Sequence, residues 1–478
     1  MPDEGSSRMT AREAITLLTG PAGFTENRPP PRPLPPDGPL GWAGYDSARE
    51  RAGARTGEEE SVVYGAGVVG DRACVLLSFE FGFLGGSLGR LTGDRLAAAY
   101  ELALTRRLPL LALVATGGSR MQEGMVALTQ LQRVAAASTR LRAAGLPQMA
   151  VLRDPTTGGG WATVGAGADV VLALPGAQVG FAGSRVRPPD ADPYAYSAEG
   201  QLAAGQVDAV VPPGELAATV THWLRALGPH DALPAAPLPR ALSTPSAPAR
   251  LPETGREAVA RARDPLRPRA EAYLADHFTV RLPLHGDRCG GTDPGLLCGF
   301  GLRADGLPVA YVAQCGTPTR PAGYRAAART IRLADRLGVP VLTLVDTPGA
   351  ANDAEAERAG AGAAIADTFA AIAAARVPVT TLVIGEGGSG GALALAAPGN
   401  THVTADSYRC IARRRGIRIL DVCGCSDNAA RCRSCRRAPA GHCGTALRAV
   451  GRGRRSGRRR ATSARAGPRP SRTGCRRR

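Results

Sequence analysis

The chain has 478 residues, 44% of them hydrophobic and only 4% aromatic, which suffices for two or three domains with cores of Ala, Val and Leu. Its formal net charge of +18 comes from residues 409–478, which hold 22 arginines and two aspartates, so the rest is nearly neutral and nucleic-acid binding is not expected. Lysine is absent, which excludes Schiff-base chemistry and the phosphate-binding lysine of a P-loop.

Residues 1–60 are rich in Pro and Gly and predict a loose N-terminal extension with one short helix near residues 11–18. They lack the basic patch and apolar stretch of a secretory signal. No later apolar run approaches the ~18 residues that a membrane span needs. We therefore expect a cytoplasmic protein without membrane contact.

Residues 61–230 and 253–408 repeat one pattern, in which a helix-like stretch leads into an apolar strand that opens with Pro and ends at a glycine-bearing loop. Such alternation predicts two α/β domains of the same design, with strands buried on both faces. Chance recurrence in an Ala- and Pro-rich chain is the alternative. A Pro-rich segment, residues 231–252, predicts a semi-rigid linker between the domains. The prolines that open the strands, equally spaced in the two domains, are Pro109, Pro147, Pro340 and Pro378.

Two glycine-rich loops follow these strands, TGGSRMQEG at residues 116–124 and GEGGSGGA at residues 385–392. A Gly-Gly step between a strand and a helix exposes unpaired backbone N–H groups with no Cβ in the way, and such groups favour negative charge. The pattern predicts two sites for anions or oxyanions. Three other interpretations are a tight turn without a ligand, a surface pair of Arg120 with Glu123, and a dinucleotide-binding fingerprint. The dinucleotide-binding interpretation leaves too few residues for a crossover helix between the glycines and Pro398.

No side-chain base accompanies these loops. Neither Ser119 nor Ser389 combines a Gly-x-Ser-x-Gly motif with the usual strand-to-helix elbow of a hydrolase nucleophile. His285 has no second histidine near it in the sequence, and residues 1–408 show neither paired carboxylates nor metal-ligand spacing. The pattern indicates a reaction that needs oxyanion stabilisation and takes its base from a substrate or cofactor.

Several motifs resemble the carboxyltransferase of bacterial acetyl-CoA carboxylase, in the order of a β subunit fused to an α subunit, over roughly residues 40–408. The β-like motifs are FGFLGGSLG (81–89), TGGSRMQEG (116–124), DPTTGG (154–159) and GFAG (180–183). The α-like motifs are LHGDR (284–288), PAGYR (321–325), DTPGA (346–350) and GEGGSGGAL (385–393).

This resemblance implies two crotonase-like domains in tandem, each built from ββα repeats. It implies transfer of a carboxyl group from carboxybiotin, carried on a separate biotin carboxyl carrier protein, to acetyl-CoA or a related acyl-CoA. The product would be malonyl-CoA for fatty acid or polyketide synthesis. A biotin carboxylase is a further implied partner, and at least a dimer is implied because the two halves of a site usually come from different protomers. The alternatives are another acyl-CoA enzyme of this fold, such as a biotin-dependent decarboxylase or a hydratase, and an inactive assembly subunit.

The resemblance also implies roles for particular residues. Backbone amides of Gly117 and Gly118 would hold the thioester enolate oxygen, and those of Gly390, Gly391 and Ala392 would hold the ureido oxygen of biotin. Biotin freed of CO2 would take the α-proton itself, in agreement with the missing side-chain base. Further cofactor-binding positions are Arg120, Phe181, Ala182, Gly183, Gly387 and Gly388.

Two features depart from the family. Residues 1–73 contain no Cys, so we predict neither the four-Cys zinc ribbon that bacterial β subunits commonly carry nor any other metal. After Tyr408 the resemblance stops, and an Arg- and Cys-rich tail, residues 409–478, follows. One interpretation of the tail is a zinc site with nucleic-acid-binding arginines. We favour a change of reading frame near codon 408, which predicts a disordered tail, an incomplete domain over residues 253–408 and impaired activity.

Overall fold

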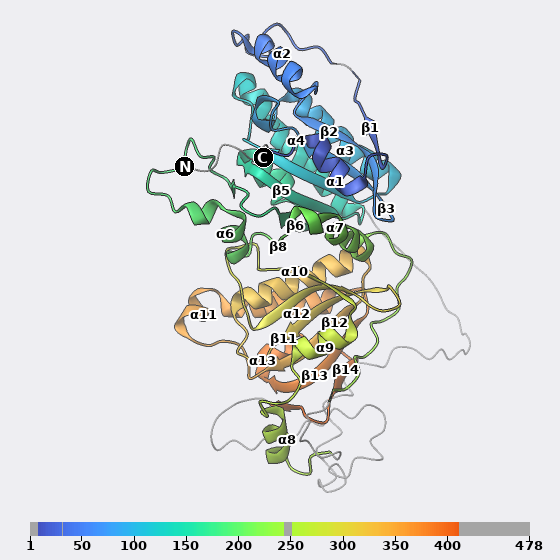
Figure 1. Ribbon diagram of the computed structural model, residues 1–478. Coiled ribbons are helices and arrows are strands. Elements are labelled where there is room, and N and C mark those ends of the chain that lie inside the picture. The colour runs from blue at the N-terminus through green and yellow to red at the C-terminus, as the bar shows by residue number, and fades with distance from the viewer. Residues whose placement is uncertain (1–7, 31, 243–250, 411–478) are drawn as a thin grey trace, which may run out of the picture. The chain divides into compact units, whose positions relative to one another are not determined.

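The computed structural model describes residues 8–30, 32–242 and 251–410, which form two β-sheets in succession along the chain (Figure 1). The first sheet has eight strands in the order β1-β2-β3-β4-β5-β6-β8, with β7 paired to β5. β2 pairs antiparallel with β1 and β3, and the later strands pair in parallel. The strands are Phe24–Asn27 (β1), Val62–Val69 (β2), Arg72–Phe79 (β3), Leu110–Thr116 (β4), Gln148–Thr157 (β5), Val170–Ala173 (β6), Val179–Gly180 (β7) and Ala209–Val210 (β8).

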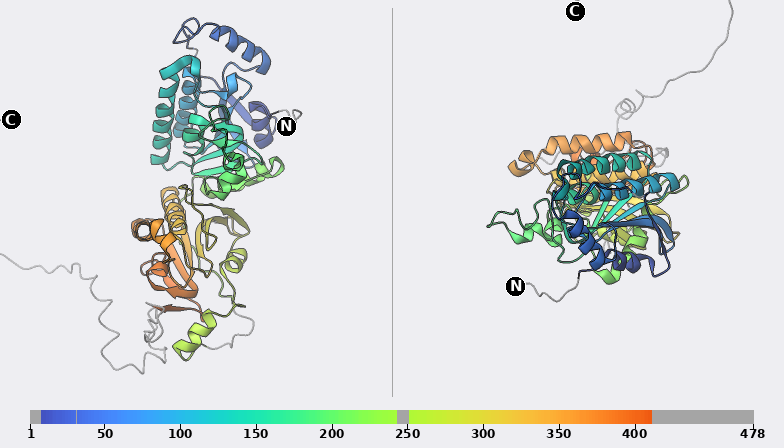
Figure 2. Two further views of the ribbon diagram at one scale, coloured as in Figure 1. Left: turned by 90° about the vertical axis from the view of Figure 1, so that its left-hand side faces the viewer. Right: turned by 90° about the horizontal axis from the view of Figure 1, so that it is seen from above.

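Helices cover both faces of this sheet, which explains why its parallel strands are apolar throughout. α3 (Arg90–Arg106) and α4 (Gly124–Ala143) pack together against one face. α1 (Ala11–Thr19) and α7 (Pro213–Leu227) lie against the other, and the left-hand view of Figure 2 shows α1 across the sheet from α3 and α4. Every residue of β4 is buried as a result.

The second sheet repeats this plan with seven strands in the order β14-β13-β12-β11-β10-β9, with β15 paired to β13. Antiparallel strands again come first and parallel strands follow. α10 (Pro321–Leu337) and α12 (Ala361–Ala374) pack together, as α3 and α4 do. The predicted repeat of one α/β design is confirmed. The strands are Val280–Pro283 (β9), Leu296–Leu302 (β10), Pro308–Gln314 (β11), Val341–Thr347 (β12), Val379–Gly388 (β13), Thr401–Val403 (β14) and Tyr408–Cys410 (β15).

The repeat extends to an irregularity in strand pairing. The register of β4 with β5 shifts between Val114 and Thr116, and the register of β12 with β13 shifts between Val345 and Thr347. Such shifts bend a strand and locally end its pairing. In both halves the shift lies at the carboxyl ends of the strands, where the glycine-rich loops begin.

The N-terminal residues pack more closely than the loose extension expected from their composition. The predicted helix is present as α1, which starts with a capping box between Thr10 and Glu13 and buries Ala11, Ala14, Ile15 and Leu18. β1 extends the first sheet, and α2 (Tyr45–Thr56) buries Tyr45. The proline content concealed this packing because few apolar residues, placed on one helix face, suffice to anchor the segment.

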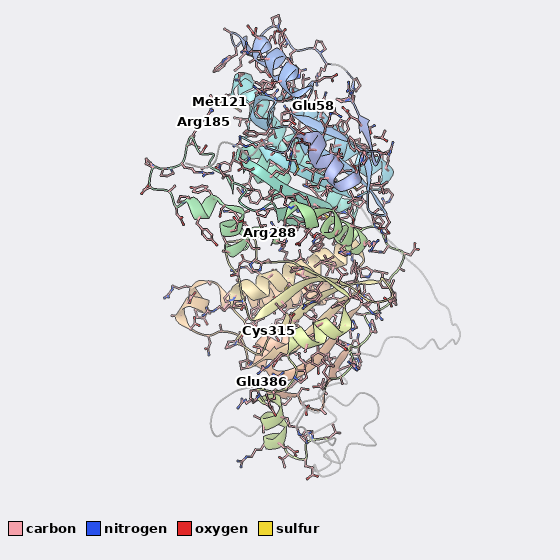
Figure 3. All side chains as sticks on the ribbon, viewed as in Figure 1. Glu58, Met121, Arg185, Arg288, Cys315 and Glu386 are labelled. Carbon is pink, nitrogen blue, oxygen red and sulfur yellow. The ribbon has the colours of Figure 1, made fainter. Side chains whose placement is uncertain are left out.

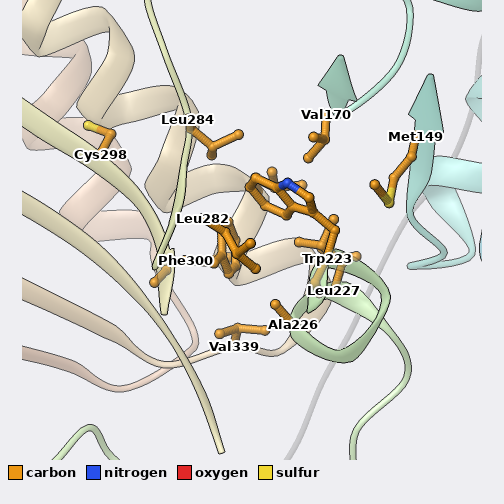
Figure 4. Packing of buried hydrophobic residues seen from close by; sticks show 14 of the residues in the cluster. Met149, Val170, Trp223, Ala226, Leu227, Leu282, Leu284, Cys298, Phe300 and Val339 are labelled. Carbon is orange, nitrogen blue, oxygen red and sulfur yellow. The ribbon is translucent and has the colours of Figure 1, made fainter. Parts of the chain in front are cut away.

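One hydrophobic cluster joins the two sheets. Trp223 of α7 is buried and its ring centroid lies 6.1 Å from that of Phe300 in β10 (Figure 4). Met149 and Val170 of the first sheet and Leu282 of the second belong to the same cluster. The two halves therefore share part of their core.

Other expectations concern the linker, the tail and membranes. In the linker, Ala236 is buried and its carbonyl accepts a hydrogen bond from Thr380 at 2.9 Å, whereas residues 243–250 lie outside the described residues. The predictions for the tail beyond residue 410 also lie outside them. Among the described helices, none is both long and apolar enough to cross a membrane.

Candidate functional site

The first glycine loop leaves the end of β4 and turns sharply at Gly118, whose φ is +104°. The Gly117 N–H donates to the carbonyl of Gly85 at 2.8 Å, and the Gly118 N–H donates to Thr116 Oγ1 at 3.0 Å. Both predicted donors are thus bound within the protein in this structure. Their hydrogen bonds fix the shape of the loop.

A second backbone segment lies against this loop. The chain leaving β5 turns into the short helix α5 (Gly158–Gly160), and a Cβ built on Gly118 would lie 3.5 Å from Gly158 Cα and 3.7 Å from Gly159 N. Gly159 is in the first helical turn, where N–H groups have no intrahelical acceptor, and no other described residue accepts from it. The geometry therefore adds Gly159 to the candidate donors of the first site.

A cavity of about 540 Å³ opens on this pair of segments, which is in the usual size range of small-molecule sites. It brings together the predicted residues Gly117, Gly118, Phe181 and Gly183. Ala182 lies between the last two, and its carbonyl accepts from Arg187 at 3.0 Å. The lining residues of this cavity include no Asp, Glu or His.

Arg120 lies behind the loop and is not among the lining residues of this cavity. It is 1% exposed, and its guanidinium contacts Glu60 at 2.5 Å, Tyr45 Oη at 3.1 Å and Glu123 at 3.6 Å. Burial alone would raise the pKa of Glu60, but the ion pair with Arg120 lowers it below its ordinary value. Arg120 and Glu123 therefore form a buried ion pair that supports the loop. From the sequence, Arg120 was considered as a ligand contact or as part of a surface pair with Glu123.

The second half repeats the arrangement of loop and helix. The loop after β12 contains Gly349, whose φ is +139°, and the short helix α13 (Ser389–Leu393) follows β13. A Cβ built on Gly391 would lie 2.5 Å from both Ala350 N and Tyr324 Oη. Only glycine at position 391 allows the helix start to approach the loop this closely.

The other predicted residues of the second site differ in exposure. Gly390 is exposed in the first turn of α13, whereas Ala392 is buried. Gly387 and Gly388 end β13, and a Cβ on Gly388 would lie 2.2 Å from the carbonyl oxygen of Pro348. These two glycines allow close backbone packing at the base of the loop.

A cavity of about 380 Å³ lies beside the loop after β12 and is lined by Gly295, Thr317, Arg320 and Ala351, among others. None of the predicted residues 387–392 lines it. All its lining residues fall between positions 293 and 353, whereas those of the first cavity fall between positions 8 and 186. Each half thus forms its own cavity. In the described parts of the chain, no three His, Cys, Asp or Glu side chains are grouped so that they could hold a metal ion.

Comparisons with known proteins agree with this duplicated architecture. The family model "Carboxyl transferase domain" matches residues 41–225, and the model "Acetyl co-enzyme A carboxylase carboxyltransferase-like" matches residues 250–413. The acetyl-coenzyme A carboxylase carboxyl transferase subunits beta/alpha of Saccharopolyspora erythraea are 38% identical over 414 residues, which cover 83% of this chain and 70% of that protein. The chain belongs to the acetyl-CoA carboxylase carboxyltransferase family. The protein of the same name from Salinispora arenicola is 39% identical, and the match covers 82% of this chain and 72% of that protein.

Solved structures show the same fold. Transcarboxylase 12S, described as a hexamer with hydrolysed methylmalonyl-coenzyme A bound, superposes with a TM-score of 0.67 over 85% of this chain and 77% of that chain, at 22% identity. A single-chain, multi-domain long-chain acyl-CoA carboxylase superposes with a TM-score of 0.65 over 84% of this chain and 39% of its own, also at 22% identity. These similarities confirm the predicted crotonase-like fold. The family models and the relatives named above confirm the predicted class, a biotin-dependent carboxyltransferase.

The sequence predicted one backbone segment of each site but not the segment that lies against it. Gly159 beside Gly118, and Gly349 and Ala350 beside Gly391, carry the other half of each arrangement. The signal was present, because both segments fall in the motifs DPTTGG and DTPGA. Pairing these motifs required the strand order, which places β4 beside β5 and β12 beside β13.

Proposed function

We propose that this carboxyltransferase moves a carboxyl group from carboxybiotin to acetyl-CoA or a close acyl-CoA homologue, giving malonyl-CoA or its homologue. The names of the relatives from Saccharopolyspora erythraea and Salinispora arenicola support acetyl-CoA as the acceptor. We further propose a biotin carboxyl carrier protein and a biotin carboxylase as partners, and the cytoplasm as the location. The observation that carries the proposal is the duplicated junction of a glycine loop with a helix N-terminus.

Each junction suits a carbonyl oxygen that becomes more negative during the reaction, because fixed backbone donors stabilise charge without reorganising. We assign the thioester oxygen to the cavity lined by Gly118 and Gly158, and Gly159 is the buried residue next to this lining. The start of α13 at Gly390 and Gly391 is assigned to the ureido oxygen, since its N–H groups are the free donors of a helix N-terminus. Arg120 acts in this account by holding the first loop in place.

The proton chemistry follows from what lines the first cavity. Its described lining has no carboxylate or imidazole to remove an α-proton. Carboxybiotin, when bound, supplies the CO2 and afterwards a basic ureido nitrogen. A hydratase would need a placed carboxylate, so the lining favours carboxyl transfer over hydration.

We also propose that each complete site forms between two copies of the chain, since each half has a separate cavity with its own loop. A C2 pair would place the first half of one copy against the second half of the other, twice. The hexameric assembly named for transcarboxylase 12S supports an oligomer of this kind.

The direct test is the reverse reaction of the purified chain with malonyl-CoA and free biotin. The proposal predicts acetyl-CoA formation that depends on biotin. Decarboxylation of malonyl-CoA without biotin, hydration of crotonyl-CoA, or no turnover by a folded protein would each contradict it and favour another acyl-CoA enzyme or an assembly subunit.

A further inference from the structure

The cavity at the first glycine loop carries positive charge on its wall. Its lining includes Arg8 and Arg185 and no carboxylate. Arg8 is already engaged, because its guanidinium lies 3.3 Å from Asp154 and over the ring of Phe81 at 5.2 Å. Arg185 makes no hydrogen bond or ion pair with any described residue, so its charge is available to a ligand.

Contacts of Arg187 anchor the loop that carries Arg185. Arg187 donates from Nε to the carbonyl of Ala182 at 3.0 Å, and its guanidinium lies 4.0 Å from the ring centroid of Tyr196. Arg185 and Ser184 line the cavity from this anchored loop, and Figure 3 shows Arg185 near Met121, which also lines the cavity. Arg185 is exposed and lines the cavity, so its guanidinium is open to a ligand there.

The surroundings of Arg185 match a ligand with an anionic end and an apolar middle. Phe181 and Val186 line the same cavity and are 73% and 74% exposed, so they offer apolar surface beside the charge. A guanidinium is the side chain best suited to a phosphate, because its planar fork donates two parallel hydrogen bonds.

We propose that Arg185 binds a phosphate group of the nucleotide part of the acyl-CoA substrate and so distinguishes CoA thioesters from shorter thioesters. The inference rests on the proposed function, which puts a CoA thioester in this cavity. It assigns a binding residue that the sequence motifs did not indicate. Arg185 holds the substrate and takes no part in the bond changes.

The test compares Arg185→Gln with the unaltered full chain. Calorimetric titration with free CoA should show a dissociation constant about tenfold or more higher, because a charge-assisted hydrogen bond is lost. In the biotin-dependent reaction of malonyl-CoA, the KM for malonyl-CoA should rise similarly while kcat stays within about twofold, and turnover of malonyl-pantetheine should not change. The control is Arg106→Gln, which removes an exposed arginine of α3 that does not line this cavity and should leave all these values unchanged.

Dephospho-CoA lacks the 3′-phosphate of CoA, so its binding shows which phosphate group Arg185 contacts. An affinity for dephospho-CoA that the substitution leaves unchanged assigns Arg185 to the 3′-phosphate, and an equal loss for both ligands assigns it to the diphosphate. Unchanged CoA affinity in Arg185→Gln, or an equal loss with malonyl-pantetheine, would overturn the proposal. Because CoA binding is measured without turnover, this outcome is distinct from failure of the proposed function, which shows as no biotin-dependent transfer by the unaltered chain.

Discussion

At the scale of single residues, Gly391 allows the start of α13 to approach the loop after β12 closely. A methyl group at this position would collide with Ala350 N and Tyr324 Oη, each 2.5 Å from the built Cβ. Gly391→Ala should displace the helix start and lower the rate of carboxyl transfer by about 10²–10³-fold, as expected for the loss of an oxyanion donor. The matched control is Gly362→Ala in α12, where a Cβ meets no atom within 4 Å. Full activity of a folded Gly391→Ala protein would count against the site.

The buried pair of Glu60 and Arg120 gives a second prediction at this scale. Glu60→Gln leaves a buried guanidinium without its main carboxylate partner, which should cost about 3–5 kcal/mol of unfolding free energy at neutral pH. The pKa of Glu60 is lowered in the folded protein from the ordinary 4.5, so its stabilisation is present above that value and is lost as the pH falls through the folded pKa. Urea unfolding should therefore show a difference in unfolding free energy between the two proteins that narrows as the pH falls below 4.5 and through the lowered pKa of Glu60. A gap that does not change with pH would exclude this ion pair as its cause.

Residue roles were harder to predict than residue positions. The glycines of both loops lie at strand ends, as their spacing indicated, because a Gly-Gly step disfavours continuation of a strand and permits the turn that follows. The role of Arg120 could not be predicted, because its partners Glu60 and Tyr45 are far from it in the sequence. The hydrogen bonds that occupy Gly117 and Gly118 likewise depend on the three-dimensional path of the loop.

At the scale of elements, α1 shows how a short sequence signal anchors a proline-rich segment. Thr10 accepts from the Glu13 N–H, and the Glu13 side chain accepts from the Thr10 N–H. Thr10→Ala removes the cap and should cost about 1 kcal/mol of unfolding free energy, measured by urea denaturation. Thr139→Ala, at an exposed position inside α4, should cost nothing measurable because alanine is the better helix former. Equal effects of the two substitutions would show that the cap does not stabilise this helix.

The order of elements was largely predictable, and their pairing was not. Proline-opened apolar strands followed by glycine loops indicated β4, β5, β12 and β13, since few other structures tolerate that pattern. The strand β1 has no comparable signal, because its four residues carry only partly buried and exposed side chains. The junction of each glycine loop with the next helix start depends on strand adjacency, which sequence spacing alone does not give.

At the scale of the whole molecule, Asp208 links the two halves within the described residues. Its side chain is fully buried and lies 2.5 Å from Arg288 and 3.1 Å from Arg329, both of the second half. Asp208→Asn should lower the unfolding free energy by about 3–5 kcal/mol, because two guanidinium groups lose their shared carboxylate. Calorimetry should then resolve two transitions in place of one, since the halves have separate sheets. The control is Asp71→Asn, whose exposed pair with Arg225 should contribute within about 1 kcal/mol. A single, unshifted transition in Asp208→Asn would show that the ion pairs of Asp208 do not hold the halves together.

The central claim is that the glycine loop of the first half in one copy and that of the second half in another form one site for carboxyl transfer. It is tested most directly by producing Gly118→Val and Gly391→Ala chains together and measuring biotin-dependent turnover of malonyl-CoA. Each variant alone should be inactive, whereas the mixed assembly should regain about a quarter of the unaltered turnover, because half of the pairs are mixed and each mixed pair has one intact site. Mixed assemblies that form but stay as inactive as the single variants would contradict the account.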